Sequence, residues 1–139
     1  MMKATAFVLL FVLTLLGCTD TDGTKDADIL SGTWQVQNIS GGFAGIDDDY
    51  TSGVITWTFA SVTSKLTVVN TNDPTTAIYD GLPTGTYDYA ILLVQNEHYL
   101  EIDGQEFSGI SFLDGQLLLD QNNRSTGSGA DGFVLRFNP

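Results

Sequence analysis

The sequence contains one cysteine, one histidine and three prolines among 139 residues, and its 5 Lys and Arg stand against 17 Asp and Glu. A single cysteine excludes an internal disulfide and a thiolate zinc cluster, and a single histidine excludes the usual multi-imidazole metal site. A net charge of −12 argues against nucleic acid and anionic lipid headgroups as partners, because both are bound mainly through clustered cations. We therefore expect no metal, no cofactor and no nucleic-acid partner.

Long hydrophobic runs are also scarce, and the longest lies at the N-terminus. Lys3 is followed by the apolar run 7–13, which is too short for the roughly 20 residues of a spanning helix and is typical of a signal peptide over residues 1–17. The tetrapeptide Leu15-Leu16-Gly17-Cys18 resembles a bacterial lipobox. This resemblance implies that Cys18 carries acyl chains such as palmitate and anchors the protein to the outer membrane of the cell envelope, on its periplasmic or surface face. The alternative is an ordinary signal peptide with an incidental Cys18.

Residues 18–29 are predicted to form an acidic, flexible tether, because they are rich in Asp, Thr and Gly and lack apolar periodicity. Their acidic run resembles the export tethers of surface lipoproteins in Bacteroidota-like bacteria. Removal of residues 1–17, which hold one lysine and no acid, would leave 122 residues with a net charge of −13. Asp20 and Asp22 lack the terminal Glu of a calcium-binding loop, so we expect no calcium there.

The remainder, residues 30–139, is predicted to be one all-β domain, since apolar residues alternate at period two in short runs separated by Gly, Asp, Asn and Pro. The predicted strands cover residues 32–39, 53–60, 65–70, a weaker 76–82, 85–95, 98–103, 106–113, 116–120 and 132–138. About eight short strands indicate a small antiparallel barrel or a sandwich. Tight hairpin turns are expected at Asp103-Gly104, at Asp114-Gly115 and at Glu97-His98, and such sequential hairpins favour an up-and-down barrel.

Three segments resemble the small lipocalin-like lipoproteins of bacteria: Leu30-Ser-Gly32-Thr33-Trp34, Gly85-Thr-Tyr87-Asp-Tyr89, and residues 131–137 at the end of the chain. The Gly-x-Trp element is shared by the wider calycin group. The resemblance implies that Trp34 closes the base of the barrel and that Arg136 lies over its indole, a cation–π contact of about 0.5–2 kcal/mol. Period two, however, places Arg136 on the face opposite Phe133, Leu135 and Phe137, and no C-terminal helix is expected.

The inward candidates for binding a small hydrophobic ligand are Trp57, Phe59, Tyr87 and Tyr89. A barrel of this size either holds one small ligand or is filled by its own side chains, and both outcomes stay open. In the second case the four residues are core, and the protein is an interaction or accessory module that binds an envelope protein through its loops, of which 41–52 and 121–132 are expected to be the longest.

Catalysis is not expected. The single His98 lies beside no nucleophile motif, and the three acids Asp47, Asp48 and Asp49 are predicted to form a solvated loop, because consecutive residues of an extended segment cannot all face one metal ion.

Overall fold

The computed structural model describes residues 28–139, which form strands joined by turns and contain no helix. The strands are β1 (Gly32–Gly41), β2 (Ile46–Asp49), β3 (Ile55–Ala60), β4 (Lys65–Asn70), β5 (Gly85–Val94), β6 (Glu97–Ile102), β7 (Gln105–Leu113), β8 (Gln116–Asp120), β9 (Asn123–Arg124), β10 (Gly127–Ser128) and β11 (Phe133–Asn138). Within this range no helix is long and apolar enough to cross a membrane.

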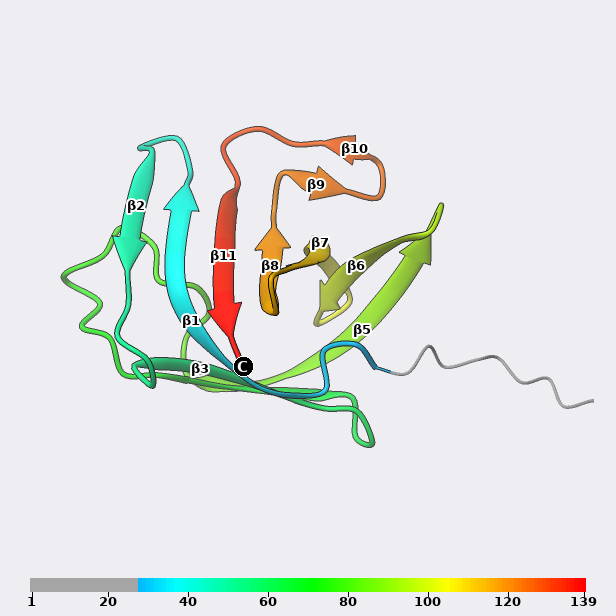
Figure 1. The fold of residues 1–139 in the computed structure, drawn as a ribbon, viewed down its shortest axis with the longest axis horizontal. Helices are drawn as coiled ribbons and strands as arrows, with labels where there is room; N and C mark the ends of the chain where they lie inside the picture. Colours follow the sequence, from blue (N-terminus) through cyan, green and yellow to red (C-terminus); the bar gives the residue numbers. More distant parts are fainter. Residues whose placement is uncertain (1–27) are drawn as a thin grey trace, which may run out of the picture.

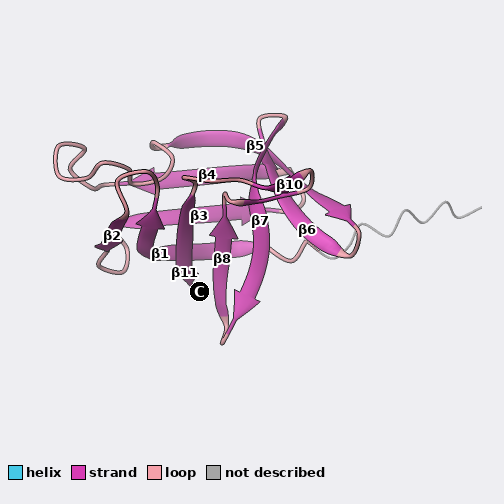
Figure 2. Cartoon of the chain, turned by 90° about the horizontal axis from the view of Figure 1, so that it is seen from above, coloured by secondary structure: helices cyan, strands magenta, loops and turns pink. Residues whose placement is uncertain are grey.

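The strands form a closed, antiparallel, eight-stranded barrel (Figures 1 and 2). Neighbours along the chain pair in turn from β3 to β8, β11 follows β8, and β1 closes the ring by pairing with both β3 and β11. Strand β2 is added beside the second half of β1, and β9 and β10 form a separate two-stranded arm. The predicted all-β, up-and-down barrel is therefore confirmed, and closure through β1 and β11 excludes the sandwich.

Alternation places the large apolar side chains inside the barrel. On β3, Ile55, Trp57 and Phe59 are at most 2% exposed, while the threonines between them are half-buried. Leu135 and Phe137 on β11 are fully buried in the same core. The interior rows therefore follow the period-two pattern of the sequence, because successive strand residues point to opposite faces.

Two of the three predicted tight turns lie where the sequence places them, and the third is displaced. Asp103 and Gly104 have φ of 49° and 78°, and the equivalent Asp-Gly turn between β7 and β8 has 51° and 80°, as expected for type I′ hairpins. The turn predicted at Glu97-His98 is wrong by two residues. Gln95 and Asn96 make it instead, with φ of 52° and 66°, and β6 already begins at Glu97.

Two further predictions about elements are wrong. Residues 76–82 form no strand, because they belong to an irregular connection, residues 71–84, between β4 and β5. The acids of residues 47–49 lie in strand β2 and not in a solvated loop, although Asp47 and Asp49 remain exposed.

The folded domain begins before Leu30. Leu30 is fully buried, Ile29 packs against the core, and Asp28 accepts hydrogen bonds from the Leu30 amide (3.0 Å) and from the Tyr89 hydroxyl. Residues 28 and 29, assigned to the tether from sequence, thus belong to the domain. A chain of residues 19–139 contains all described strands and their core. The predicted signal peptide, Cys18 and the first part of the predicted tether lie outside the described residues.

Candidate functional site

The four inward candidates fall into two groups. Trp57 and Phe59 are 0% and 2% exposed, and the Trp57 ring centroid lies 5.2 Å from that of Phe137 and 6.3 Å from that of Phe59. Tyr89 is buried edge-on against Phe59 at 5.0 Å, whereas Tyr87 is half-buried and its hydroxyl donates to the Pro83 carbonyl (2.8 Å). Three of the four therefore contribute to the core. Ligand binding by this set stays a prediction.

Trp34 and Arg136 have different neighbours in the structure. The Trp34 indole N–H donates to the Leu30 carbonyl at 2.8 Å, and the ring lies 5.9 Å from that of Phe112. Arg136 is exposed on β11, opposite Asn38 of β1, while its neighbours Leu135 and Phe137 are buried. The contacts described for Trp34 thus join it to Leu30 and Phe112, and the cation–π pairing implied by the family resemblance stays a prediction.

Two polar atoms are buried in the barrel without a partner among residues 28–139: the indole Nε1 of Trp57 and the hydroxyl of Ser108. A β-bulge on β7, between the pairings of Leu100 and Glu101, lets Phe107 as well as Ser108 join the interior, and the Phe107 ring lies 5.7 Å from that of Trp57. Unpaired buried donors are uncommon because each costs about 1–3 kcal/mol. Trp57 Nε1 and the Ser108 hydroxyl are therefore the two places in the interior where a bound molecule could gain a hydrogen bond.

Residues 71–84 close one end of the barrel. The Tyr79 ring stacks on Phe133 of β11 at 4.0 Å and 13°, and its hydroxyl accepts a hydrogen bond from Gln121 (3.1 Å). Burial raises the pKa of Tyr79, an effect that the bond from Gln121 partly opposes. Gly81 lies against the core, since a Cβ added to it would make ordinary van der Waals contact with Leu135 Cδ2 (3.6 Å) and with Trp57 Cζ2 (3.7 Å). The interior is therefore covered on this side.

The same connection forms one wall of a pocket on the outside of the barrel, with a volume of about 340 Å³. Strand β2 and the residues after it form the other wall. We call this pocket the β2 cleft. Its lining residues are Asp47, Asp48, Asp49, Tyr50, Thr51, Val54, Asn72, Thr76 and Ala77.

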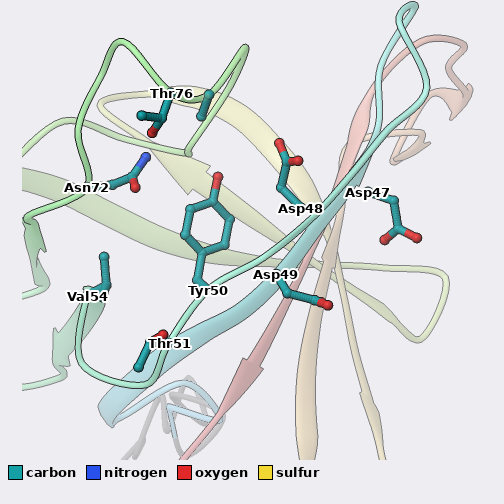
Figure 3. Close-up of a pocket in the computed structure, with 9 residues that line it drawn as sticks. Asp47, Asp48, Asp49, Tyr50, Thr51, Val54, Asn72 and Thr76 are labelled. Carbon is teal, nitrogen blue, oxygen red and sulfur yellow. The ribbon is translucent and has the colours of Figure 1, made fainter.

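The acids of the β2 cleft divide between the two faces of β2. Asp47 and Asp49 both accept hydrogen bonds from the Asn38 side chain, at 2.8 and 2.9 Å, and their carboxylates point away from the cleft. Asp48 and Tyr50 project on the other side, toward the wall that carries Asn72 and Thr76 (Figure 3). One carboxylate, one phenol and a facing wall of amide and hydroxyl groups thus converge.

The electrostatics of the β2 cleft favour positive charge. Burial raises the pKa of Tyr50, and the nearby charges of Asp48 and Asp80 raise it further. The described residues include three cations, Lys65, Arg124 and Arg136, and none of them lines the cleft. Residues 28–139 contain no group of three or more His, Cys, Asp or Glu side chains arranged to hold a metal ion. The cleft can therefore attract a cationic group and offer it polar partners.

Sequence reasoning identified only one wall of this cleft. The segment 41–52 is a candidate recognition loop in the sequence, and it contains the acids 47–49, which the sequence predicts only to be solvated. Asn72, Thr76 and Ala77 carried no signal, because they are polar or small residues in a stretch assigned to a weak strand. Only the position of residues 71–84 beside β2 brings the two walls together (Figure 3).

Comparisons of the chain with protein-family models, with curated proteins and with solved structures yield no match.

Proposed function

We propose that the protein is a non-enzymatic binding module of the cell envelope, anchored by lipid on Cys18, and that it binds an envelope protein at the β2 cleft. The observation that carries this proposal is the contrast between the two concave regions of the fold. The interior candidates Trp57 and Phe59 are enclosed by core side chains, whereas Asp48 and Tyr50 converge with Asn72 in an open pocket. The open pocket on the outer surface is therefore the better-supported binding region.

Exposed apolar side chains extend both walls of the cleft along the chain. Phe43, in the turn that precedes β2, is 93% exposed, and Ile78, which follows Ala77, is 73% exposed. Isolated exposed apolar residues are common, but aromatic and large aliphatic side chains beside a polar pocket are typical of protein-binding surfaces. This composition favours a protein partner over a small solute.

The predicted anchor suits such a module. The ten residue steps from Cys18 to Asp28 could span at most about 36 Å at roughly 3.3–3.6 Å per residue, so the domain would stay near the membrane surface. Confinement at one surface raises the effective concentration of partners that are anchored in the same membrane. A modest cleft could then suffice for stable association.

The proposal is tested by photo-crosslinking in cells that produce the full-length protein. A photoreactive p-benzoylphenylalanine introduced at Thr51 or at Thr76 should capture a defined envelope protein. The same residue introduced at Leu113, which is exposed at the β7–β8 hairpin, is the matched control and should capture little. Equal capture from Leu113 and from the cleft positions, or no capture at all, would refute a partner at this site.

Binding of a small hydrophobic ligand inside the barrel is the second candidate function. The unpaired Trp57 Nε1 and Ser108 hydroxyl favour it, because a bound molecule with a polar end could satisfy both groups. Purified residues 19–139 should then enhance the fluorescence of an environment-sensitive fatty-acid probe, and lipid should compete. A Ser108→Ala variant should bind the probe more weakly. Absence of binding across a broad apolar panel would eliminate this candidate.

A further inference from the structure

Strand β2 leaves one edge of the sheet open. Among the strands that the structure describes, β2 stands at the end of the nine-stranded order and pairs with β1 alone, from Asn38 opposite Asp49 to Gly41 opposite Ile46. An unpaired edge presents backbone N–H and C=O groups that can pair with another extended chain. The barrel otherwise has no free edge, since β1 and β11 close it.

The β2 cleft runs beside this edge. Asp47 and Asp49 line the cleft, although their carboxylates are turned away from it toward Asn38 (Figure 3). We therefore infer that the backbone edge of β2, and not these two side chains, faces the cleft. The opposite wall, with Asn72 and Thr76, belongs to the connection between β4 and β5. The cleft is therefore a slot that has a strand edge on one side and polar side chains on the other.

We propose that the β2 cleft receives an extended, basic segment of a partner protein, which adds to β2 as a further strand. Backbone pairing with β2 would supply affinity, and a Lys or Arg side chain on the same face as Asp48 would supply selectivity. The Tyr50 hydroxyl donates to the Tyr79 carbonyl (3.4 Å), so its oxygen is left to accept a hydrogen bond from the same segment. The Asn72 amide donates to the Asp73 carbonyl (3.4 Å) and to the Asp80 carboxylate (3.2 Å), so it too offers its oxygen as an acceptor. This inference rests on the proposed function and specifies the chemistry of its partner.

Charge excludes a second copy of this chain as the occupant. If β2 paired with β2 of another copy, aspartates would stand against aspartates across the new ladder, and like charges opposite each other are destabilising. The described residues carry three cations against fourteen acids, so two such domains also repel as wholes. The acids that prevent self-association select a strand of opposite charge.

The first experiment uses residues 19–139 and short fluorescent peptides of alternating Lys and Val, at low ionic strength. The Lys peptide should bind, and a peptide with Glu in place of Lys should not. Two further peptides carry N-methyl groups on the Lys residues or on the Val residues, which removes the N–H donors from one edge of the peptide strand at a time. One of them should lose about tenfold in affinity and the other should bind normally, because only one edge of an added strand faces β2.

The second experiment compares two variants that remove one acid each. Asp48→Asn should weaken binding of the Lys peptide by about two- to fivefold, the range of a single exposed charge pair. Asp114→Asn, in the exposed turn between β7 and β8, makes the same change of charge away from the cleft and should leave the affinity unchanged. Circular dichroism verifies that both variants are folded. Slower hydrogen exchange of the β2 amides in the presence of peptide would locate the added strand.

Three results overturn the inference: no binding of the Lys peptide, equal binding of both N-methylated peptides, or equal weakening by the two variants. The first excludes a basic occupant, and the others indicate charge attraction without strand pairing. Each can coexist with specific crosslinking at Thr51 and Thr76, in which case the proposed function stands and only the nature of the partner segment is wrong. Only a failure of the crosslinking experiment would refute the proposed function.

Discussion

Replacement of Trp57 by alanine tests whether the barrel interior is a packed core. The side chain is fully buried, and its ring meets those of Phe59, Phe107 and Phe137 at 5.2–6.3 Å. An aromatic side chain of about 150–250 Å² contributes about 4–6 kcal/mol by burial at roughly 25 cal/mol per Å². The unpaired indole N–H opposes this by about 1–3 kcal/mol. The difference is about 1–5 kcal/mol, and the cavity left by truncation adds to it, so we expect a loss of about 3–5 kcal/mol, as for other buried aromatic truncations.

The assay is reversible thermal and urea unfolding of residues 19–139, followed by circular dichroism. For a domain of this size, about 4 °C of Tm corresponds to 1 kcal/mol, so Trp57→Ala should lower the Tm by about 12–20 °C. Trp57→Phe should cost about 1–2 kcal/mol less than the alanine variant, since both remove the unpaired donor but only phenylalanine keeps a ring in the site.

Trp34→Phe provides the spectroscopic control, because it leaves Trp57 as the single tryptophan of the chain. The remaining fluorescence should then be blue-shifted and protected from acrylamide. A Tm decrease smaller than about 4 °C for Trp57→Ala, or free quenching of Trp57, would refute a packed interior and favour a cavity that can hold a ligand.

The remaining predictions concern the anchor, the barrel base and the alkaline limit of stability. Cys18→Ala should abolish metabolic labelling with palmitate and release the protein from membranes, whereas unchanged retention would contradict the anchor. If the Arg136 guanidinium lies over Trp34 as the resemblance implies, Arg136→Ala should reduce the free energy of unfolding by about 0.5–2 kcal/mol and so lower the Tm by about 2–8 °C, and an unchanged melting curve would exclude that contact. Burial holds the pKa of Tyr79 above the ordinary value of 10.0, so the unfolded chain loses this proton first and stability should fall as the pH rises above about 10. Tyr79→Phe should make that fall shallower in Tm measurements between about pH 9 and pH 11, and an identical pH profile would contradict burial of the hydroxyl.

Much of the barrel could be predicted because local patterns and tertiary demands agree there. Ile55, Trp57 and Phe59 alternate as a half-buried strand requires, and they occupy the interior. Asp-Gly pairs specify their turns because their positive φ is tolerated locally, whatever the rest of the chain does. In both cases the sequence signal and the structural cause lie within a few residues of each other.

Predictions failed where a contact distant in sequence decided the local structure. Residues 46–49 become strand β2 because β1 offers a pairing edge and Asn38 binds two of the carboxylates, neither of which the acidic run reveals. The apolar character of residues 76–82 resembles a strand, yet Tyr79 is used to seal the barrel end against Phe133. The bulge that brings Phe107 and Ser108 into the interior has no mark in the sequence.

The candidate site shows the same division. The sequence predicts the segment 41–52 to be a long loop of the kind that carries recognition, but it assigns only a solvated role to the three acids within it. The opposite wall at Asn72 and Thr76 carries no such signal, because polar residues of a connection acquire a role only from what they face. Likewise, the sequence could name Trp57 and Phe59 as inward residues but could not say whether they line a cavity or fill it.

The sequence by itself determined the all-β class, the meander of hairpins, the inward rows and the acidic character, because each follows from short-range periodicity, turn chemistry or composition. Tertiary structure alone decided the closure of β1 on β11, the open edge of β2 and the cleft beside it. These features depend on which strands distant in sequence pair and in which register. Pairing and register are decided only when all strands pack around one common core.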